Sequence, residues 1–278
     1  MQIGDMRIDA LLDGEAVVPP SFCYANYSEE GWEPHKHFLD PFSDMVVHTL
    51  GGFLVRYDDK VVLVDAGVGP QPIFPFAGGA MRSAFFKLGV TPSEVTDVVF
   101  THLHLDHIGW ATVGGKIYFD NANFHVDKRD WDFFMSPDYD VPEWEQGVSD
   151  PSRDPATVRL APLADRINFF VGDSELLPGI ETVDAAGHTP GSTVLRLTSQ
   201  GEQGMLLGDL VHTQPELIED RWDFLAHIEH EQGMDSIERI RKELFDKNLP
   251  FAAAHFPGLQ WGKIANDDSG KLSYARIE

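Results

Sequence analysis

The stretch Thr101-His-Leu-His-Leu-Asp-His107 places three histidines and one aspartate within seven residues. Imidazole nitrogens and carboxylate oxygens are the ligands that Zn²⁺ accepts from a protein that offers no thiolates. The spacing excludes an ordinary helical metal site, because ligands on one helix face recur three or four residues apart. Residues Thr96–Thr101 are typical of a buried strand, and Ile108-Gly109 permits a tight turn. The four side chains therefore converge only from a strand end that turns into a loop.

Three later segments repeat this arrangement of a strand followed by a metal-binding residue type. They are Glu181–His188, Gly204–Asp209 and Phe251–His255. Open α/β sheets place their sites beyond the carboxyl ends of the strands. We therefore expect the last residue of each segment to join the first stretch in one metal site.

Seven residues of these types are enough for two metal ions. A catalytic site leaves a coordination position open for water, and two ions roughly 3.5–4 Å apart can share a hydroxide. The pattern therefore indicates a hydrolytic enzyme rather than a binding module. The predicted ligands are His102, His104 and His188 for one ion, Asp106, His107 and His255 for the second, and Asp209 as a bridge.

The same motifs resemble those of the metallo-β-lactamase superfamily. The matching pieces are His102-x-His104-x-Asp106-His107, Gly187-His188-Thr-Pro-Gly191, Gly208-Asp209, Ala254-His255 and the early Val62-Leu-Val-Asp65-Ala-Gly67. The resemblance covers about residues 45–260 and implies a four-layer αββα sandwich of the α/β class with two metal ions. It also implies that Asp65 orients a ligand rather than binding metal. The alternative is an Asp that caps the turn before Gly67.

The residues at positions 209, 212 and 110 indicate which branches of the superfamily the chain resembles. Class B β-lactamases lack a bridging carboxylate at the position of Asp209, so the chain is more similar to the glyoxalase II, lactonase and phosphotriesterase-like branches. The acyl-homoserine lactonases carry Tyr three residues after this Asp, whereas this chain has His212. The stretch Gly208–His212 looks more like methyl parathion hydrolase. Trp110 stands where glyoxalase II usually has a second Gly, which argues against that activity.

The leading hypothesis is a dinuclear hydrolase whose bridging hydroxide attacks a lactone or another carboxylic ester. Asp106 is a candidate proton shuttle, and His212 either hydrogen-bonds the substrate or supports a ligand. Organophosphate triester hydrolysis is the alternative, and a non-catalytic metal-binding scaffold is the third hypothesis. Zinc is the expected metal, while Mn, Fe and Co also suit such ligands.

Composition limits the partners of the protein. A formal net charge of −24 repels nucleic acid and anionic membranes, and solubility is its favoured explanation. Neither a neutral nor a cationic substrate would be repelled, and the expected partner is a small neutral ester-type substrate. Cys23 is the only cysteine, which excludes an internal disulfide framework and a cysteine-based zinc site. No apolar run approaches ~18 residues and no signal-peptide core is evident, so a cytoplasmic protein is expected.

The chain is expected to form a single domain over residues 1–278 with two long loops. The aromatic-rich loop 17–44 is predicted either to cover the metal site or to make a homodimer contact. The proline-rich loop 136–162 is predicted either to wall the substrate pocket or to be a surface excursion. Trp110, Trp222 and the aromatic residues of 17–44 would suit an apolar acyl chain.

Several local patterns predict individual elements. Alternating residues favour a first strand and a hairpin, and helical periodicity favours three helices. The predicted strands are Met6–Leu12, Val46–Tyr57 and Lys60–Val64, and the predicted helices are Gly79–Leu88, Lys128–Phe134 and Met234–Phe245, the last with Met234, Ile237, Ile240, Leu244 and Phe245 on its buried stripe.

Overall fold

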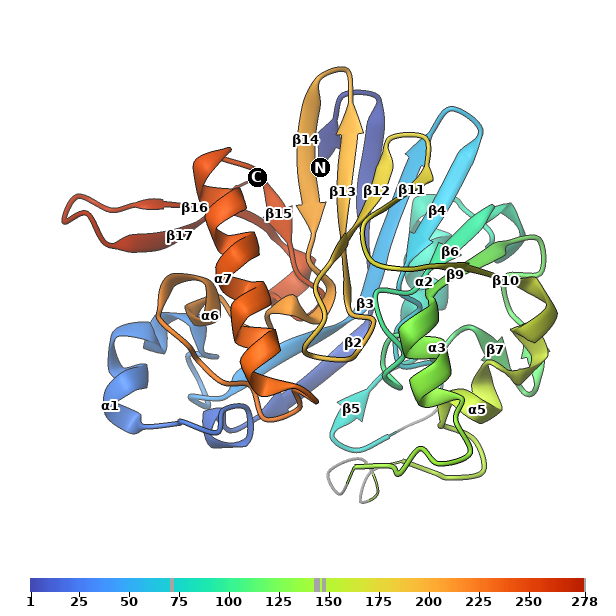
Figure 1. Ribbon diagram of the computed structural model, residues 1–278, viewed down its shortest axis with the longest axis horizontal. Coiled ribbons are helices and arrows are strands. Elements are labelled where there is room, and N and C mark those ends of the chain that lie inside the picture. Colours follow the sequence, from blue (N-terminus) through green and yellow to red (C-terminus); the bar gives the residue numbers. More distant parts are fainter. Residues whose placement is uncertain (71–72, 143–145, 147–148, 278) are drawn as a thin grey trace.

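Two large mixed β-sheets form the centre of the molecule (Figure 1). The computed structural model describes residues 1–70, 73–142, 146 and 149–277. The first sheet contains β1 (Gln2–Ile3), β2 (Met6–Val18), β3 (Val46–Tyr57), β4 (Lys60–Val64), β6 (Asp97–Val99), β9 (Asn123–Asp127) and β10 (Ile167–Phe170) in that order, with β5 (Phe76–Ala77) paired to β2. The second contains β11 (Ser174–Leu177), β12 (Ile180–Asp184), β13 (Thr193–Ser199), β14 (Glu202–Leu206), β15 (Phe251–Ala252), β16 (Trp261–Asn266) and β17 (Leu272–Arg276). A separate small ribbon pairs β7 (Thr112–Val113) with β8 (Lys116–Ile117).

The alternation of side chains along the strands brings the two sheets together face to face. Phe53 and Val55 of β3 lie in one buried cluster with Leu195 and Leu197 of β13. Leu54, between them, belongs to a different cluster on the outer face of the first sheet. Successive residues of a strand point to opposite faces, so one strand contributes to two hydrophobic layers.

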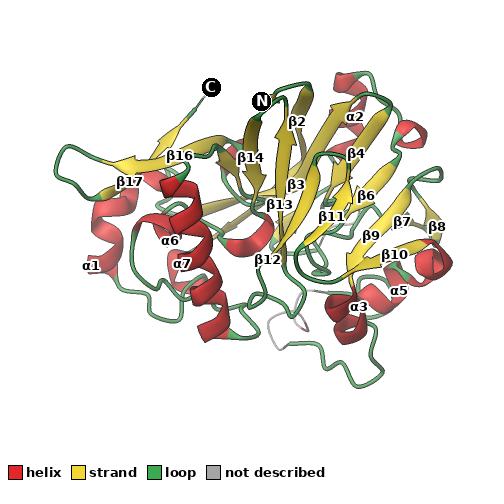
Figure 2. Ribbon diagram, turned by 45° about the horizontal axis from the view of Figure 1, so that its top comes forward, coloured by secondary structure: helices red, strands yellow, loops and turns green. Residues whose placement is uncertain are grey.

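Helices cover the two outer faces, as Figure 2 shows. Buried residues of α2 (Met81–Leu88) and α3 (Lys128–Phe134) pack on the first sheet, and those of α7 (His230–Asp246) pack on the second. The predicted four-layer αββα sandwich is therefore confirmed. The shorter helices are α1 (Glu29–Trp32), α5 (Ala156–Arg159) and α6 (Pro215–Ile218), and the 3-10 turns are η1 (Pro20–Phe22), η2 (Glu33–Phe38), η3 (Pro92–Glu94), η4 (Ala161–Arg166), η5 (Gly208–Leu210) and η6 (Pro257–Leu259).

Most local predictions hold, and four need correction. The first strand runs to Val18, and residues 17–44 are not a structureless loop, because η1, α1 and η2 lie within them. The segment 136–162 contains α5, while its residues 143–145 and 147–148 lie outside the described residues. Phe245 is 38% exposed rather than on the buried stripe of α7. It follows Leu244 by one residue, and therefore points about 100° away from it around the helix.

The described helices include none that is both long and apolar enough to cross a membrane.

Candidate metal centre

Both sheets contribute to one cluster of histidines and aspartates. The loop Thr101–His107 follows β6 of the first sheet, after Phe100. His188 follows β12, Asp209 lies in η5 after β14, and His255 follows β15, all in the second sheet. The predicted strand-end origin of these residues is therefore observed.

A glycine allows the two halves to approach each other. Gly208 precedes Asp209 and has φ of +53°, in the left-handed region. A Cβ atom at this position would lie 2.8 Å from Cβ of Thr101. Glycine therefore permits the Asp209 turn to pack directly against the loop that carries His102.

The first predicted ligand set is a compact group of three imidazoles. Nδ1 of His104 lies 2.9 Å from Nε2 of His102 and 2.9 Å from Nε2 of His188. A neutral imidazole carries only one N–H, so three ring nitrogens facing one point cannot satisfy one another by hydrogen bonding alone. Nitrogens arranged in this way fit a divalent ion such as Zn²⁺.

The second predicted set lies beside the first. Ligand atoms of Asp106, His107 and His255 all lie within 4.8 Å of one another. Nε2 of His255 is 3.7 Å and Nε2 of His107 is 3.9 Å from Oδ2 of Asp106. The structure thus brings these three residues together without a direct hydrogen bond among them.

Asp209 lies between the two sets. Its Oδ1 is 3.2 Å from Nε2 of His107, and its Oδ2 is 3.0 Å from Nε2 of His255. The same Oδ2 lies 3.7 Å from Nε2 of His102 and 3.5 Å from Nε2 of His188. Oδ1 of Asp209 and Nε2 of His107 are buried and make no hydrogen bond with any described residue. Buried polar atoms are rarely left unpaired, so this geometry fits two metal ions with Asp209 between them.

The pKa is lowered for the histidines of the first predicted set and raised for His107 of the second. Burial lowers the pKa of His102 and His188 well below the ordinary value and lowers that of His104 to about 4. For His107, burial acts in the same direction, but the carboxylates of Asp209 and Asp65 outweigh it and raise the pKa well above the ordinary value. The three-histidine set is therefore neutral, which is the form that binds a metal ion.

Asp65 holds the metal-site loop in place. Its Oδ2 lies 2.9 Å from Nδ1 of His107 and accepts a hydrogen bond from the Thr101 hydroxyl. Its Oδ1 accepts a hydrogen bond from the Thr101 backbone N–H at 2.8 Å. These contacts match the orienting role expected for Asp65 rather than the turn-capping alternative.

His212 lies at the edge of the cluster. Its ring stacks on Phe224, with centroids 3.3 Å apart and planes inclined by 8°. Nε2 lies 3.3 Å from Oδ2 of Asp209, and Nδ1 lies 3.5 Å from Oε2 of Glu216. Burial lowers the pKa of His212, but these two carboxylates outweigh it and raise the pKa to about 9.

Glu216 in turn is fixed by several donors. Its Oε1 accepts hydrogen bonds from the backbone N–H groups of His212 and Thr213 and from the Tyr24 hydroxyl, at 2.7–2.8 Å. Tyr24 comes from the segment 17–44, which was predicted to be a loop. The segment 17–44 therefore helps to fix Glu216, whose carboxylate contacts the ring of His212.

A cavity of about 220 Å³ opens onto the cluster. Its polar floor is formed by the metal-site residues, and its walls are mainly apolar. The lining residues are Ala16, Val18, Phe22, Cys23, His48, Pro75, Phe76, His104, Asp106, His188, Asp209, His212, Phe224, Leu225, Ala226 and His255. None of these described lining residues is Lys or Arg, so the cavity suits an uncharged ligand.

The cavity tests four expectations about its walls. Residues 17–44 do cover the site, through Val18, Phe22 and Cys23, whereas no described residue of 136–162 lines it. Trp110 was predicted to lie near the substrate, and this prediction is wrong. The side chain is fully buried beside Tyr118, in the hydrophobic cluster on the outer face of the first sheet.

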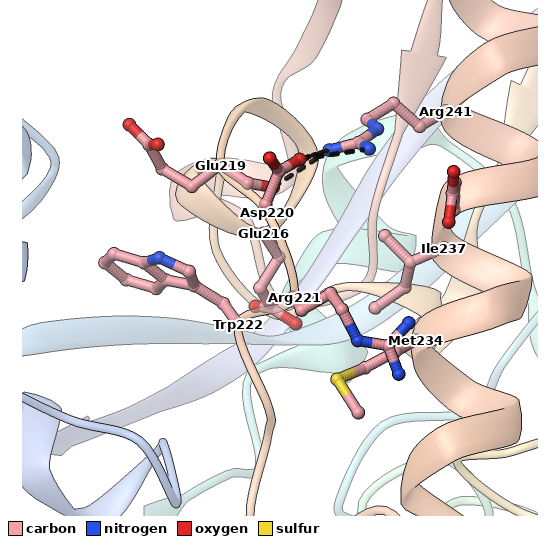
Figure 3. A pocket seen from close by; sticks show the side chains of 9 residues that line it. Glu216, Glu219, Asp220, Arg221, Trp222, Met234, Ile237 and Arg241 are labelled. Atoms are coloured by element: carbon pink, nitrogen blue, oxygen red, sulfur yellow. Dashed lines mark hydrogen bonds and ion pairs between the residues drawn. The ribbon is translucent and has the colours of Figure 1, made fainter.

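Trp222 was also expected near the substrate, and it instead lines a second cavity of about 260 Å³ with Glu216 and Arg241 (Figure 3). In this cavity Arg241 donates to the Glu219 carbonyl and to the Asp220 carboxylate. Glu216 lines this cavity and also lies behind His212. The second cavity is therefore separated from the metal site by this glutamate.

Sequence reasoning missed His48, His227, Glu216 and Phe224, whereas Tyr24 was one of the aromatic residues of 17–44 expected near the substrate. Nδ1 of His227 lies 3.3 Å from Nδ1 of His188, and His48 lines the cavity. None of these residues stands in a recognisable motif. Only Glu216 had a local signal, because it lies four residues after His212 in the chain, and in the structure its carboxylate in α6 contacts the His212 ring from the start of that helix.

Comparison with known proteins identifies the family. A family model described as the metallo-beta-lactamase superfamily matches residues 52–248. The chain belongs to the metallo-β-lactamase superfamily.

Relatives within this superfamily include lactonases. The N-acyl homoserine lactonase AiiA of Bacillus thuringiensis subsp. kurstaki is 25% identical over 167 residues, which are 59% of this chain and 56% of that protein. The match thus spans little more than half the length of this relative.

Among solved structures of the superfamily, the hydrolase AbOPH aligns with a TM-score of 0.84 at 24% identity, covering 100% of this chain and 96% of its own. AidC, a dizinc quorum-quenching lactonase in complex with a product, aligns with a TM-score of 0.83 at 21% identity and the same coverage. At these identities the likeness shows a shared fold.

Proposed function

We propose that the protein is a metal-dependent hydrolase that uses two divalent ions to open lactones or cleave other small carboxylic esters. The observation that carries this proposal is the position of Asp209, whose carboxylate lies within 3.7 Å of histidines from both predicted ligand sets. The lactonase relatives support the choice of substrate class. Zinc is the proposed metal, because three imidazoles and carboxylates form one of its usual donor sets.

The ions would be held by His102, His104 and His188, by Asp106, His107 and His255, and by Asp209 between the two sets. Divalent ions bound there would supply Lewis-acid chemistry, lowering the pKa of water and polarising an ester carbonyl.

The residues of the chain itself position the substrate and move protons. Asp106 lines the cavity, and its carboxylate is the proposed proton shuttle during cleavage. His212 also lines the cavity, and its stacking on Phe224 fixes the direction in which its Nε2 points. The apolar walls exclude water from the ester, which strengthens every charge interaction within the site.

An organophosphate triester is the second candidate substrate. The lack of Lys or Arg among the described lining residues favours a neutral electrophile, and a triester is neutral as well. A non-catalytic scaffold is disfavoured, because all seven predicted ligands and an open cavity are present together.

Metal stoichiometry measured together with hydrolysis tests the proposal. Protein purified without chelator is analysed for metal content and assayed on a γ-lactone, an aryl ester and a neutral phosphotriester. About two ions per chain with lactone or ester turnover is the expected result. Turnover of the triester alone would replace the carboxylic ester by the second candidate. No turnover of any substrate by the fully loaded protein would overturn the hydrolase proposal.

A further inference from the structure

His48 is a buried polar residue in the substrate cavity that belongs to neither predicted ligand set. It lies in β3 opposite Ala16 of β2, and both residues line the cavity. Its residue exposure is 8%. The centroid of its ring lies 5.3 Å from that of His255, 6.2 Å from that of His212 and 6.3 Å from that of Phe224. His48 therefore lies beside the metal centre but outside it.

Nε2 of His48 is buried and has no hydrogen-bond partner among the described residues. Oδ1 of Asp209 and both ring nitrogens of His212 also lack such a partner, but each lies 3.2–3.5 Å from an oppositely charged or metal-site group. Sγ of Cys23 lies 3.8 Å from the Pro19 carbonyl oxygen. His48, in contrast, makes no ion pair with a described residue and belongs to none of the metal-ligand groups. Nε2 of His48 is therefore a polar group that the described part of the protein leaves for a ligand.

The surroundings of His48 are otherwise apolar. Ala16, Val18, Pro75 and Phe76 line the same cavity. Binding cavities of this kind use a small number of placed polar groups to fix the orientation of a ligand. A neutral imidazole presents a donor or an acceptor at Nε2 according to its tautomer.

We propose that His48 is a substrate-orienting residue whose Nε2 hydrogen-bonds a second polar group of the substrate, outside the bond that is cleaved. This inference rests on the proposed ester or lactone hydrolysis and narrows its substrate class. The favoured substrates carry a carbonyl or amide a few bonds from the cleaved ester, where it reaches His48 while the ester lies at the metal centre. A plain alkyl ester lacks this group and leaves Nε2 of His48 without a partner.

A matched pair of lactones separates this contact from general packing. α-Acetamido-γ-butyrolactone carries the second polar group, and α-propyl-γ-butyrolactone replaces it by an alkyl group of similar size. Steady-state kinetics are measured for the wild type, His48→Phe, which removes both ring nitrogens, and His48→Gln, which keeps a side-chain amide near the position of Nε2. His37→Phe, a change at an exposed histidine outside the cavity, is the matched control. Metal content is measured for every variant.

For His48→Phe we expect a loss of about tenfold in kcat/KM for the acetamido lactone, mainly through KM, and a much smaller loss for the propyl lactone. His48→Gln should recover part of the loss, and the metal content should stay at the wild-type value. An equal change for the two lactones, or a fall in metal content, would overturn the orienting role while leaving the hydrolase proposal intact. If the loaded wild type opens neither lactone, the proposed lactone hydrolysis fails, and this inference fails with it.

Discussion

Asp209 is the residue that connects the two predicted ligand sets. It is 5% exposed and contacts four histidines from both predicted ligand sets. Burial raises the pKa of this carboxyl group, but the histidines outweigh burial and hold the pKa well below its ordinary value. Asp209 is therefore a carboxylate and available to bridge two cations.

Replacing Asp209 by Asn should lower metal content and activity together. The amide keeps the shape but loses the negative charge and half of the acceptor capacity, so the second ion should bind at least 100-fold more weakly. Elemental analysis and turnover of the active substrate measure the two effects. Asp132→Asn on the exposed side of α3 is the control, and wild-type metal content in Asp209→Asn would refute the bridge.

At His212, the prediction is a loss of activity with retention of metal. The residue contacts Asp209 and Glu216 but is not needed to complete either predicted set. His212→Ala should keep about two ions per chain and reduce turnover about tenfold or more. Loss of an ion in this variant would make His212 a metal ligand, since it also forms a close group with His188 and Asp209.

At the scale of elements, α3 joins the loops that carry the three-histidine set. Oδ2 of Asp130 accepts hydrogen bonds from the Leu103 N–H and the Thr189 hydroxyl, and Oδ1 accepts one from the Gly191 N–H. Burial raises the pKa of Asp130 to about 7, although its hydrogen bonds oppose this. One side chain of α3 thus fixes the neighbours of His102, His104 and His188.

Asp130→Ala should weaken binding of the ion in the three-histidine set by about 10–100-fold, because residues that orient metal ligands have effects of this size. Competition with a metal chelator measures the affinity. Asp132→Ala lies on the same helix, where its exposed carboxylate pairs with Lys128, and should leave the affinity unchanged. Equal affinities in all three proteins would remove Asp130 from the metal-site support.

Strand β2 holds one wall of the substrate cavity in place through a buried carboxylate. Asp13 is fully buried and accepts backbone hydrogen bonds at 2.9–3.0 Å from Val68, Gly69, Gly79 and Met81. The segment between these donors includes Pro75 and Phe76, which line the substrate cavity. The position of this wall therefore depends on one carboxylate in β2.

Asp13→Ala should lower the free energy of unfolding by about 3 kcal/mol, because it leaves four backbone donors without their buried acceptor. Urea denaturation of the wild type and the variant measures this difference. A change below about 0.5 kcal/mol would show that the segment does not depend on Asp13. Asp5→Ala, near the start of the same strand, is the exposed control.

The sequence predicted elements best where the pattern was local. The hairpin of β3 and β4 and the helix α3 were predicted with their observed bounds, because alternation, turn residues and helical periodicity lie within each segment. The segment 17–44 was misread, since its short helices depend on long-range contacts. Trp32 and Tyr24 pack against Trp222, which is almost two hundred residues away in the chain.

At the scale of the whole molecule, buried charge far from the metal centre makes stability depend on pH. Asp97, only 1% exposed, contacts Lys60 and His125. Burial raises the pKa of Asp97, but hydrogen bonds from His125, Thr96 and Lys60 outweigh it and hold the pKa well below its ordinary value. Because the folded-state pKa is lowered, the contribution of Asp97 to stability is present above its unfolded-state pKa. It is lost as the pH falls through the folded-state value.

Asp97→Asn should therefore reduce the free energy of unfolding by about 2 kcal/mol at pH 7. The difference from the wild type should shrink as the pH falls below about 4, the unfolded-state pKa of an aspartate. Urea denaturation of metal-free wild type and variant at pH 7 and pH 3 measures both differences. A difference that stays constant between the two pH values would exclude the charge of Asp97 as its source.

The fold and the ligand residues were accessible from sequence because they are carried by motifs at strand ends. The substrate side of the site was not. His48, Phe224 and Glu216 belong to no motif, and only the packing of β3, the 219–227 segment and α6 around the cavity brings them to the metal centre. Nearness in the sequence can also mislead. Trp110 follows the metal-site loop closely in the sequence, but its side chain is buried in the hydrophobic cluster on the outer face of the first sheet.

The predicted metal ligands are spread along the chain and over two sheets, so they are synthesised in a fixed order. Ribosomes make the chain from its N-terminus, so the three-histidine set is complete once His188 has emerged. Under the proposed assignment the bridge follows at Asp209, and the second set waits for His255. A nascent chain that has passed His188 but not His255 therefore contains every residue of the first set and only part of the second. The second set cannot be complete before β15, which pairs in parallel with β14, has been made.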